Sequence, residues 1–154
     1  ADALFCFGEI DCREGVIAAV EKGAYDSPQE AMLMLIDIYV STLLRVKAQR
    51  KLRRVFVLAP LAILNVTRHI VAAFSQVFDA AAPQMRAKGL IPINTTDDIL
   101  TLPTEASADK PHDVPKSMGE LRVLRPELQL DHTHIHPCFV PQVLAPAINA
   151  ALTQ

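Results

Sequence analysis

The chain has 154 residues, of which 51% are hydrophobic and 21% charged, and its formal net charge is −2. This length fits one domain with a substantial core. The small net charge excludes a general attraction to nucleic acid or anionic lipid, and no apolar segment reaches the roughly 18 residues of a membrane span. Cys6, Cys12 and Cys138 lack CxxC spacing, so we expect reduced thiols and a cytoplasmic protein.

The first third of the chain predicts a strand followed by a long helix. Residues 3–7 (ALFCF) are a short apolar run that ends at Gly8, as a buried strand does. Residues 14–25 are expected to form a loop or a short helix. The letters SPQE then predict a helix start, with Ser27 as the cap of a capping box. Apolar residues recur every three or four positions up to about Arg50, so we expect one long helix there.

A second strand, a second helix and a third strand follow. Residues 55–59 (VFVLA) predict a buried strand. Asn65 or Thr67 is expected to start a helix, which Pro83 should kink or restart because proline lacks a backbone N–H. Residues 90–94 (LIPIN) predict an edge strand, since their proline cannot contribute to a central ladder.

The last third is irregular for most of its length. Residues from 95 to about 121 are proline-rich and polar, which predicts a long loop, and a terminal helix over 141–154 is interrupted by Pro146. The alternation of strands and helices implies parallel pairing through right-handed crossovers. We therefore predict a single α/β domain over residues 1–154, with a mostly parallel sheet in a three-layer α/β/α arrangement.

Charged residues gather where the first strand ends. Glu9, Asp11 and Arg13 follow Gly8 within five positions, and because unpaired buried charges are costly we expect a mutual ion-pair network among them. Asn65 follows the second strand. Since ligands of parallel α/β sheets bind at the carboxyl ends of the strands, these residues are expected to line one crevice. The alternative is a tight turn in which Asp11 pairs with Arg13 or caps the next helix.

A second polar cluster, DHTHIHP, precedes the terminal helix. Asp131 and His134 are three residues apart, which lets the carboxylate hold one imidazole N–H and leaves the other nitrogen as a base. A purely structural Asp–His contact is the alternative. In an extended segment His132, His134 and His136 would share one face and could bind zinc, although Pro137 favours a turn that breaks this alternation.

These pieces occur in a characteristic order: a strand ending FGEIDCR, an hhhLAP-type strand, INTTDDIL, and ELQLDHTHIHP before a terminal helix. From about 3 to 143 the chain resembles the C-terminal part of the SGNH/GDSL-type hydrolases, in the branch with GEIDCR and LDxTHxHP stretches. The resemblance implies a partial flavodoxin-like fold, with Asp131 and His134 as the acid and base of a Ser-His-Asp triad. It places Gly8 at the oxyanion hole, and His136, which directly precedes a proline, is the fallback base.

The chain departs from that family in two respects. Ile10 stands where the family has an asparagine that donates to the oxyanion, so Arg13 or a backbone N–H would have to replace it. The family's first two blocks, which include the nucleophilic serine, lie N-terminal to the block around Gly8, and only a few residues precede Gly8 here. None of the serines present replaces the nucleophile, so we expect a fragment or a half-domain.

Three hypotheses about function follow. The first is the C-terminal part of an ester hydrolase fold, acting on a small acyl or acetyl ester with a nucleophile from outside this chain, without a cofactor and with little activity alone. The second is a non-enzymatic binding or interaction domain on the same fold. The third is a metal-dependent hydrolase that uses the HTHIH stretch. An exposed sheet edge and an uncovered helix face favour a homo-oligomer.

Overall fold

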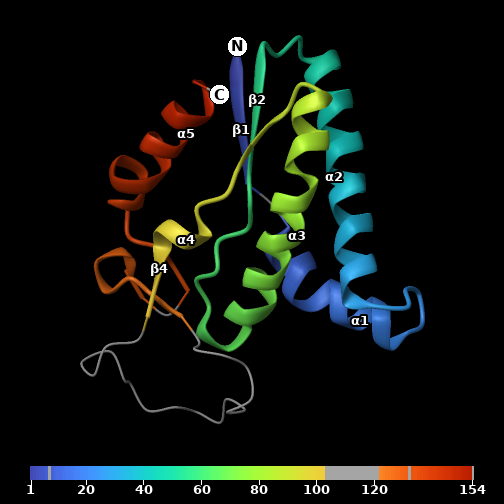
Figure 1. The fold of residues 1–154 in the computed structure, drawn as a ribbon, viewed down its shortest axis with the longest axis vertical. Helices are drawn as coiled ribbons and strands as arrows, with labels where there is room; N and C mark the ends of the chain where they lie inside the picture. Colours follow the sequence, from blue (N-terminus) through green and yellow to red (C-terminus); the bar gives the residue numbers. More distant parts are fainter. Residues whose placement is uncertain (7, 103–121, 132, 154) are drawn as a thin grey trace.

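The structure is a computed structural model that describes all residues except 7, 103–121, 132 and 154 (Figure 1). Its main sheet has three parallel strands in the order β1-β2-β3, namely β1 (Asp2–Cys6), β2 (Arg54–Leu58) and β3 (Ile91–Ile93). Cys6 lies beside Leu58, and Leu58 beside Ile93, so all three strands end at the same edge. The parallel sheet and the edge position of the third strand are confirmed.

Helices cover both faces of this sheet (Figure 1). On one face, α2 (Pro28–Gln49) and α3 (Arg68–Ala87) share a core with Val55 and Val57. On the other face, the π-helical turn η5 (Val140–Leu144) and α5 (Ala145–Ala151) pack on Phe56, Leu58 and Ile93. Successive side chains of β2 therefore enter opposite layers, as the pleat of a strand requires. The predicted three-layer α/β/α arrangement is confirmed.

The start of α2 follows the predicted capping pattern closely. The Ser27 hydroxyl accepts a hydrogen bond from the Glu30 N–H at 3.2 Å, and Pro28 occupies the first helical position. The Glu30 carboxylate accepts from the N–H of Asp26 at 2.9 Å. In a standard capping box the Glu30 carboxylate would accept from the N–H of the cap residue, Ser27, whereas here it accepts from the preceding residue.

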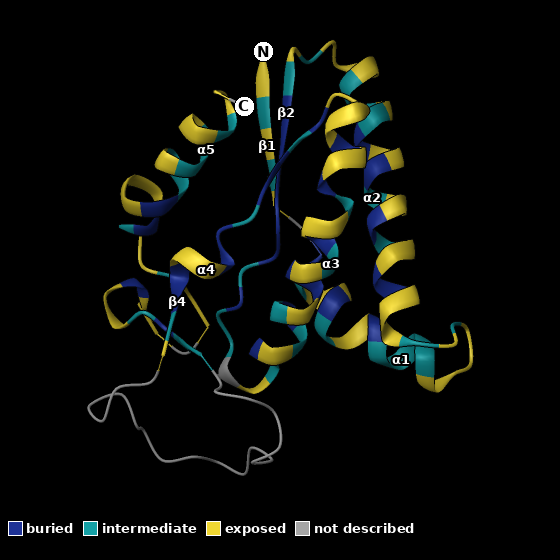
Figure 2. Ribbon diagram, viewed as in Figure 1, coloured by how far each residue is buried: buried dark blue, intermediate teal, exposed yellow. Residues whose placement is uncertain are grey.

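The core lies mainly between α2, α3 and the sheet. Figure 2 shows both helices buried where they face the sheet and each other and exposed outside, and the buried side chains include Ile36, Val40, Phe74 and Met85. α3 continues through Pro83 without a break, so the predicted restart is wrong. Packing of its apolar face offsets the loss of one backbone hydrogen bond. None of the helices in the described part is long and apolar enough to cross a membrane.

Two segments are more regular than predicted. The chain turns helical directly after Gly8, through the π-helical turn η1 (Asp11–Gly15) and α1 (Val16–Glu21). Within the predicted loop 95–121, residues form α4 (Thr96–Ile99) and β4 (Leu100–Thr101), which pairs antiparallel with β5 (Val123–Leu124). Two 3₁₀ turns, η2 (Asn65–Thr67) and η4 (Pro126–Leu128), complete the described elements. Most of that loop lies outside the described residues.

Candidate functional site

The carboxyl end of β1 is shaped by a contact between Gly8 and Tyr39. Gly8 is buried and has a φ of +86°, and a Cβ placed on it would lie 2.6 Å from both Cε2 and Oη of Tyr39. The Tyr39 hydroxyl donates a hydrogen bond to Oδ2 of Asp11 at 2.6 Å. Only glycine therefore lets α2 bring the phenol over the end of the strand. The sequence prediction missed Tyr39, although a hydroxyl on the apolar face of a helix was a signal for it.

Charges at this end of the sheet are paired, but not as predicted. Nε of Arg13 lies 2.9 Å from the Glu9 carboxylate, and Nη1 lies 2.8 Å from that of Glu14. Asp11 does not join this network, because it accepts from Tyr39 instead. The helix that begins after Gly8 brings Glu9 and Arg13 together, since residues four apart share a helix face. Arg13 is thus balanced by two carboxylates.

Burial and negative charge keep the nearby hydroxyl and thiol protonated. Burial, together with the hydrogen bond to Asp11, raises the pKa of Tyr39 above its usual range. Burial and the carboxylates of Glu9 and Asp11 raise the pKa of Cys12 to about 12. Because the thiolate is the nucleophilic form of cysteine, Cys12 is not an activated nucleophile.

The loop after β2 is held by Arg68 at the start of α3. Its guanidinium is buried and donates from Nε to the carbonyl of Ala62 at 3.0 Å and from Nη2 to that of Ile63 at 2.7 Å. These bonds fix the segment that follows β2 at the carboxyl edge of the sheet. Asn65, the residue predicted for this crevice, begins η2, and its side chain lies outside the described part of the structure.

Asp131 organises a tight turn before the terminal helix. Leu130 donates its N–H to the carbonyl of His134 at 3.1 Å, which closes the turn. Oδ1 of Asp131 accepts from the backbone N–H of Thr133 at 2.7 Å and of His134 at 2.8 Å. These donors, together with the His134 ring, hold the pKa of Asp131 well below its usual range. The carboxylate therefore stays ionised throughout the physiological range of pH.

The same carboxylate orients the imidazole of His134. Oδ2 of Asp131 lies 2.8 Å from Nδ1 of His134, so the network assigns the Nδ1 proton to this bond and the lone pair to Nε2. His136 has the opposite arrangement, because its Nδ1 accepts from the N–H of Cys138 at 3.1 Å. The geometry thus favours His134 over His136 as a base. The side chains of His134 and Asp131 are 70% and 50% exposed.

The zinc alternative gains no support from the described residues. They contain no group of three histidine, cysteine, aspartate or glutamate side chains that could hold a metal ion. His132 lies outside the described residues. His134 and His136 each direct Nδ1 to a partner within the protein, as described above.

The two polar clusters remain separate in the described part of the chain. No hydrogen bond or ion pair found there joins Asp131 or His134 to the segment 8–14. In Figure 1 the turn before η5 lies on the α5 side of the sheet, whereas α1 lies on the side of α2 and α3. The structure therefore groups Gly8 and Asp11 with Tyr39, and separately pairs Asp131 with His134.

The cavity whose lining includes Tyr39 is too small for a substrate. The space between α2, α3 and β2 measures about 10 Å³, which is room for about one water. A polar groove of about 540 Å³ lies elsewhere, and its lining includes Asp97, Thr101, Arg125 and Glu127. Because the His134 side chain is 70% exposed, an ester acted on at the turn would bind on the surface.

Comparisons of this chain with models of protein families, with curated proteins and with solved structures gave no match. The SGNH/GDSL resemblance thus stays a prediction from the sequence motifs. The function is argued below from the geometry of the two clusters.

Proposed function

We propose that this chain is part of an SGNH-like ester hydrolase fold and supplies its acid–base pair. The observation that carries this proposal is the contact between Asp131 and Nδ1 of His134, which leaves Nε2 as the basic nitrogen. His134 would take the proton of an attacking hydroxyl that comes from outside this chain. Asp131 would stabilise the imidazolium, and His134 would then protonate the departing alcohol. The substrate is a small acyl or acetyl ester.

The helix start after Gly8 supports a role in binding the oxyanion. The first N–H groups of a helix lack intrahelical acceptors and carry the positive end of the helix dipole. The side chain of Ile10 cannot donate, and that of Arg13 is held by Glu9 and Glu14. Backbone N–H groups of this first turn are therefore the proposed donors, and they act together with His134 only on an ester that lies across the carboxyl edge of the sheet between the two clusters.

Hydrolysis of p-nitrophenyl acetate by the chain alone tests the base. We expect slow turnover, because no hydroxyl of the described residues is hydrogen-bonded to Nε2 of His134 and water must be activated directly. His134→Ala should lower kcat/KM at pH 8 by about tenfold, which is less than the roughly 10²–10⁴-fold typical of general bases because the ring is exposed. His136→Ala is the matched control and should change the rate by less than about twofold. Equal rates for wild type and His134→Ala would contradict the proposal.

A binding or interaction domain on the same fold is the second candidate. The observation that favours it is Ile10, which is 61% exposed at the position where a donor to the oxyanion is expected. An apolar side chain at this position cannot donate to an oxyanion, whereas its exposed surface can contact a partner. Retention of the full esterase rate in His134→Ala would leave this candidate as the better one.

A further inference from the structure

β1 presents a row of unpaired backbone groups along its outer side. Within the described strands it is an edge strand and pairs only with β2. The carbonyl of Ala1 accepts from the N–H of Arg53 at 2.8 Å, so the groups of Ala1 face β2. Because the direction of these groups alternates along a strand, the N–H and C=O of Asp2, Leu4 and Cys6 point away from β2.

This edge lacks the devices that normally protect an edge strand. Such strands usually carry lysine, proline, a bulge or an inward-pointing charge. β1 reads DALFC, and its single charge is neutralised because both Arg53 and Arg54 donate to the carboxylate of Asp2. Leu4 is 40% exposed, and Cys6 is exposed as well. The strand is therefore open to pairing with another strand.

We propose that a second copy of this chain pairs with β1 in antiparallel orientation, about a two-fold axis that passes beside Leu4. In this register Leu4 lies opposite the partner's Leu4, and Asp2 lies opposite the partner's Cys6. These are the residues whose N–H and C=O point outward, so each opposed pair forms two hydrogen bonds. The two three-stranded sheets join into one, and neither edge at the junction remains open.

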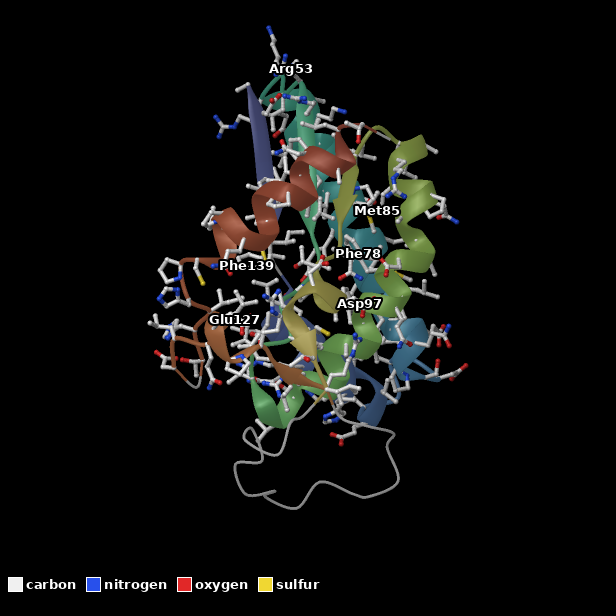
Figure 3. All side chains as sticks on the ribbon, turned by 60° about the vertical axis from the view of Figure 1, so that its left-hand side comes forward. Arg53, Phe78, Met85, Asp97, Glu127 and Phe139 are labelled. Atoms are coloured by element: carbon white, nitrogen blue, oxygen red, sulfur yellow. The ribbon has the colours of Figure 1, made fainter. Side chains whose placement is uncertain are left out.

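Charge complementarity identifies a second copy as the occupant. Arg50, Lys51, Arg53 and Arg54 gather at the end of the molecule where β1 begins, and Figure 3 shows Arg53 there. Glu9, Asp11 and Glu14 follow the opposite end of the strand, and Arg13 offsets only one of these three charges. Antiparallel pairing places the basic end of each copy beside the acidic end of the other. The side chains of Arg53 and Glu14 are 71% and 62% exposed, so both can reach a neighbour.

Analytical ultracentrifugation with matched leucine variants tests the interface. We expect wild type to reach a dimer in a concentration series up to about 1 mM and Leu4→Lys to remain monomeric. Leu33→Lys changes a similarly exposed leucine on α2 and should dimerise like wild type. The dimer should weaken between about 0.05 and 1 M NaCl, because exposed ion pairs are screened. Circular dichroism should show the same fold for all three proteins.

Leu4→Pro provides a second test that does not depend on adding a charge. The Leu4 N–H points outward, so proline removes an intermolecular donor and leaves the ladder to β2 intact. We expect a folded monomer. If the wild-type chain is monomeric up to about 1 mM, the proposal is overturned. A second copy would then not be the partner of the β1 edge. Dissociation by Leu33→Lys but not by Leu4→Lys also overturns the proposal, since the interface would then lie on α2.

Discussion

Replacing Gly8 by alanine should destabilise the protein more than any other change of glycine to alanine that we compare. A residue with a side chain at φ +86° costs about 1–2 kcal/mol. The new Cβ would also lie 2.6 Å from Cε2 and Oη of Tyr39, so the ring must move and its hydrogen bond to Asp11 is lost. The loss of this hydrogen bond to an exposed carboxylate adds about 1 kcal/mol to the cost. We expect a loss of about 2–3 kcal/mol in the free energy of unfolding.

Urea unfolding followed by circular dichroism measures this loss. With a slope of about 2 kcal/mol per molar urea, the midpoint should fall by about 1 M or slightly more. Gly23→Ala is the control, because Gly23 has a φ of +69° but nothing within 4 Å of its Cβ position. It should lose only the backbone contribution, about 1–2 kcal/mol. If both variants lose the same free energy, or if Tyr39→Ala does not lessen the cost of Gly8→Ala, the proposed contact is wrong.

Three further predictions concern a cap, a thiol and a carboxylate. Ser27→Ala should cost about 1 kcal/mol in urea unfolding, whereas Ser41→Ala, inside α2, should cost clearly less. A maleimide at pH 7 should label exposed Cys6 and leave Cys12 unlabelled until urea is added, as mass spectrometry will show. The lowered pKa of Asp131 stabilises the folded state above the unfolded pKa of about 3.9 and ceases to do so as pH falls through the folded pKa. Urea midpoints of wild type and Asp131→Asn should therefore converge as pH falls from 5 towards about 2.

Local signals in the sequence predicted much of the fold. Short apolar runs marked all three strands of the main sheet, and SPQE marked the start of α2. The alternation of strands and helices along the chain was enough to predict parallel pairing, because a crossover helix between two strands leaves few other topologies. Such features depend on residues that are close in sequence or on rules of chain connection.

Contacts between distant residues explain what the sequence did not reveal. Residues 9–13 were expected to line a crevice or to form a tight turn after the first strand, yet they begin a helix. Asp11 in this helix contacts Tyr39, which lies 28 residues further along the chain. Likewise β4 was assigned to a loop because its two residues carry no periodicity. It is a strand only because β5 pairs with it across the segment that separates them. Patterns within a short window cannot report either contact.

The Asp131–His134 pair was predictable because its geometry is local, and the same fact decides how its function must be tested. Oδ1 of Asp131 holds the turn through two backbone N–H groups, whereas Oδ2 holds the imidazole. Asp131→Asn therefore disturbs the turn and the base together, and a loss of activity in that variant would be ambiguous. His134→Ala removes the imidazole but keeps both backbone donors, so the turn persists. A change in esterase rate in this variant reports the chemistry of the base, because the structural role of the turn belongs to the carboxylate.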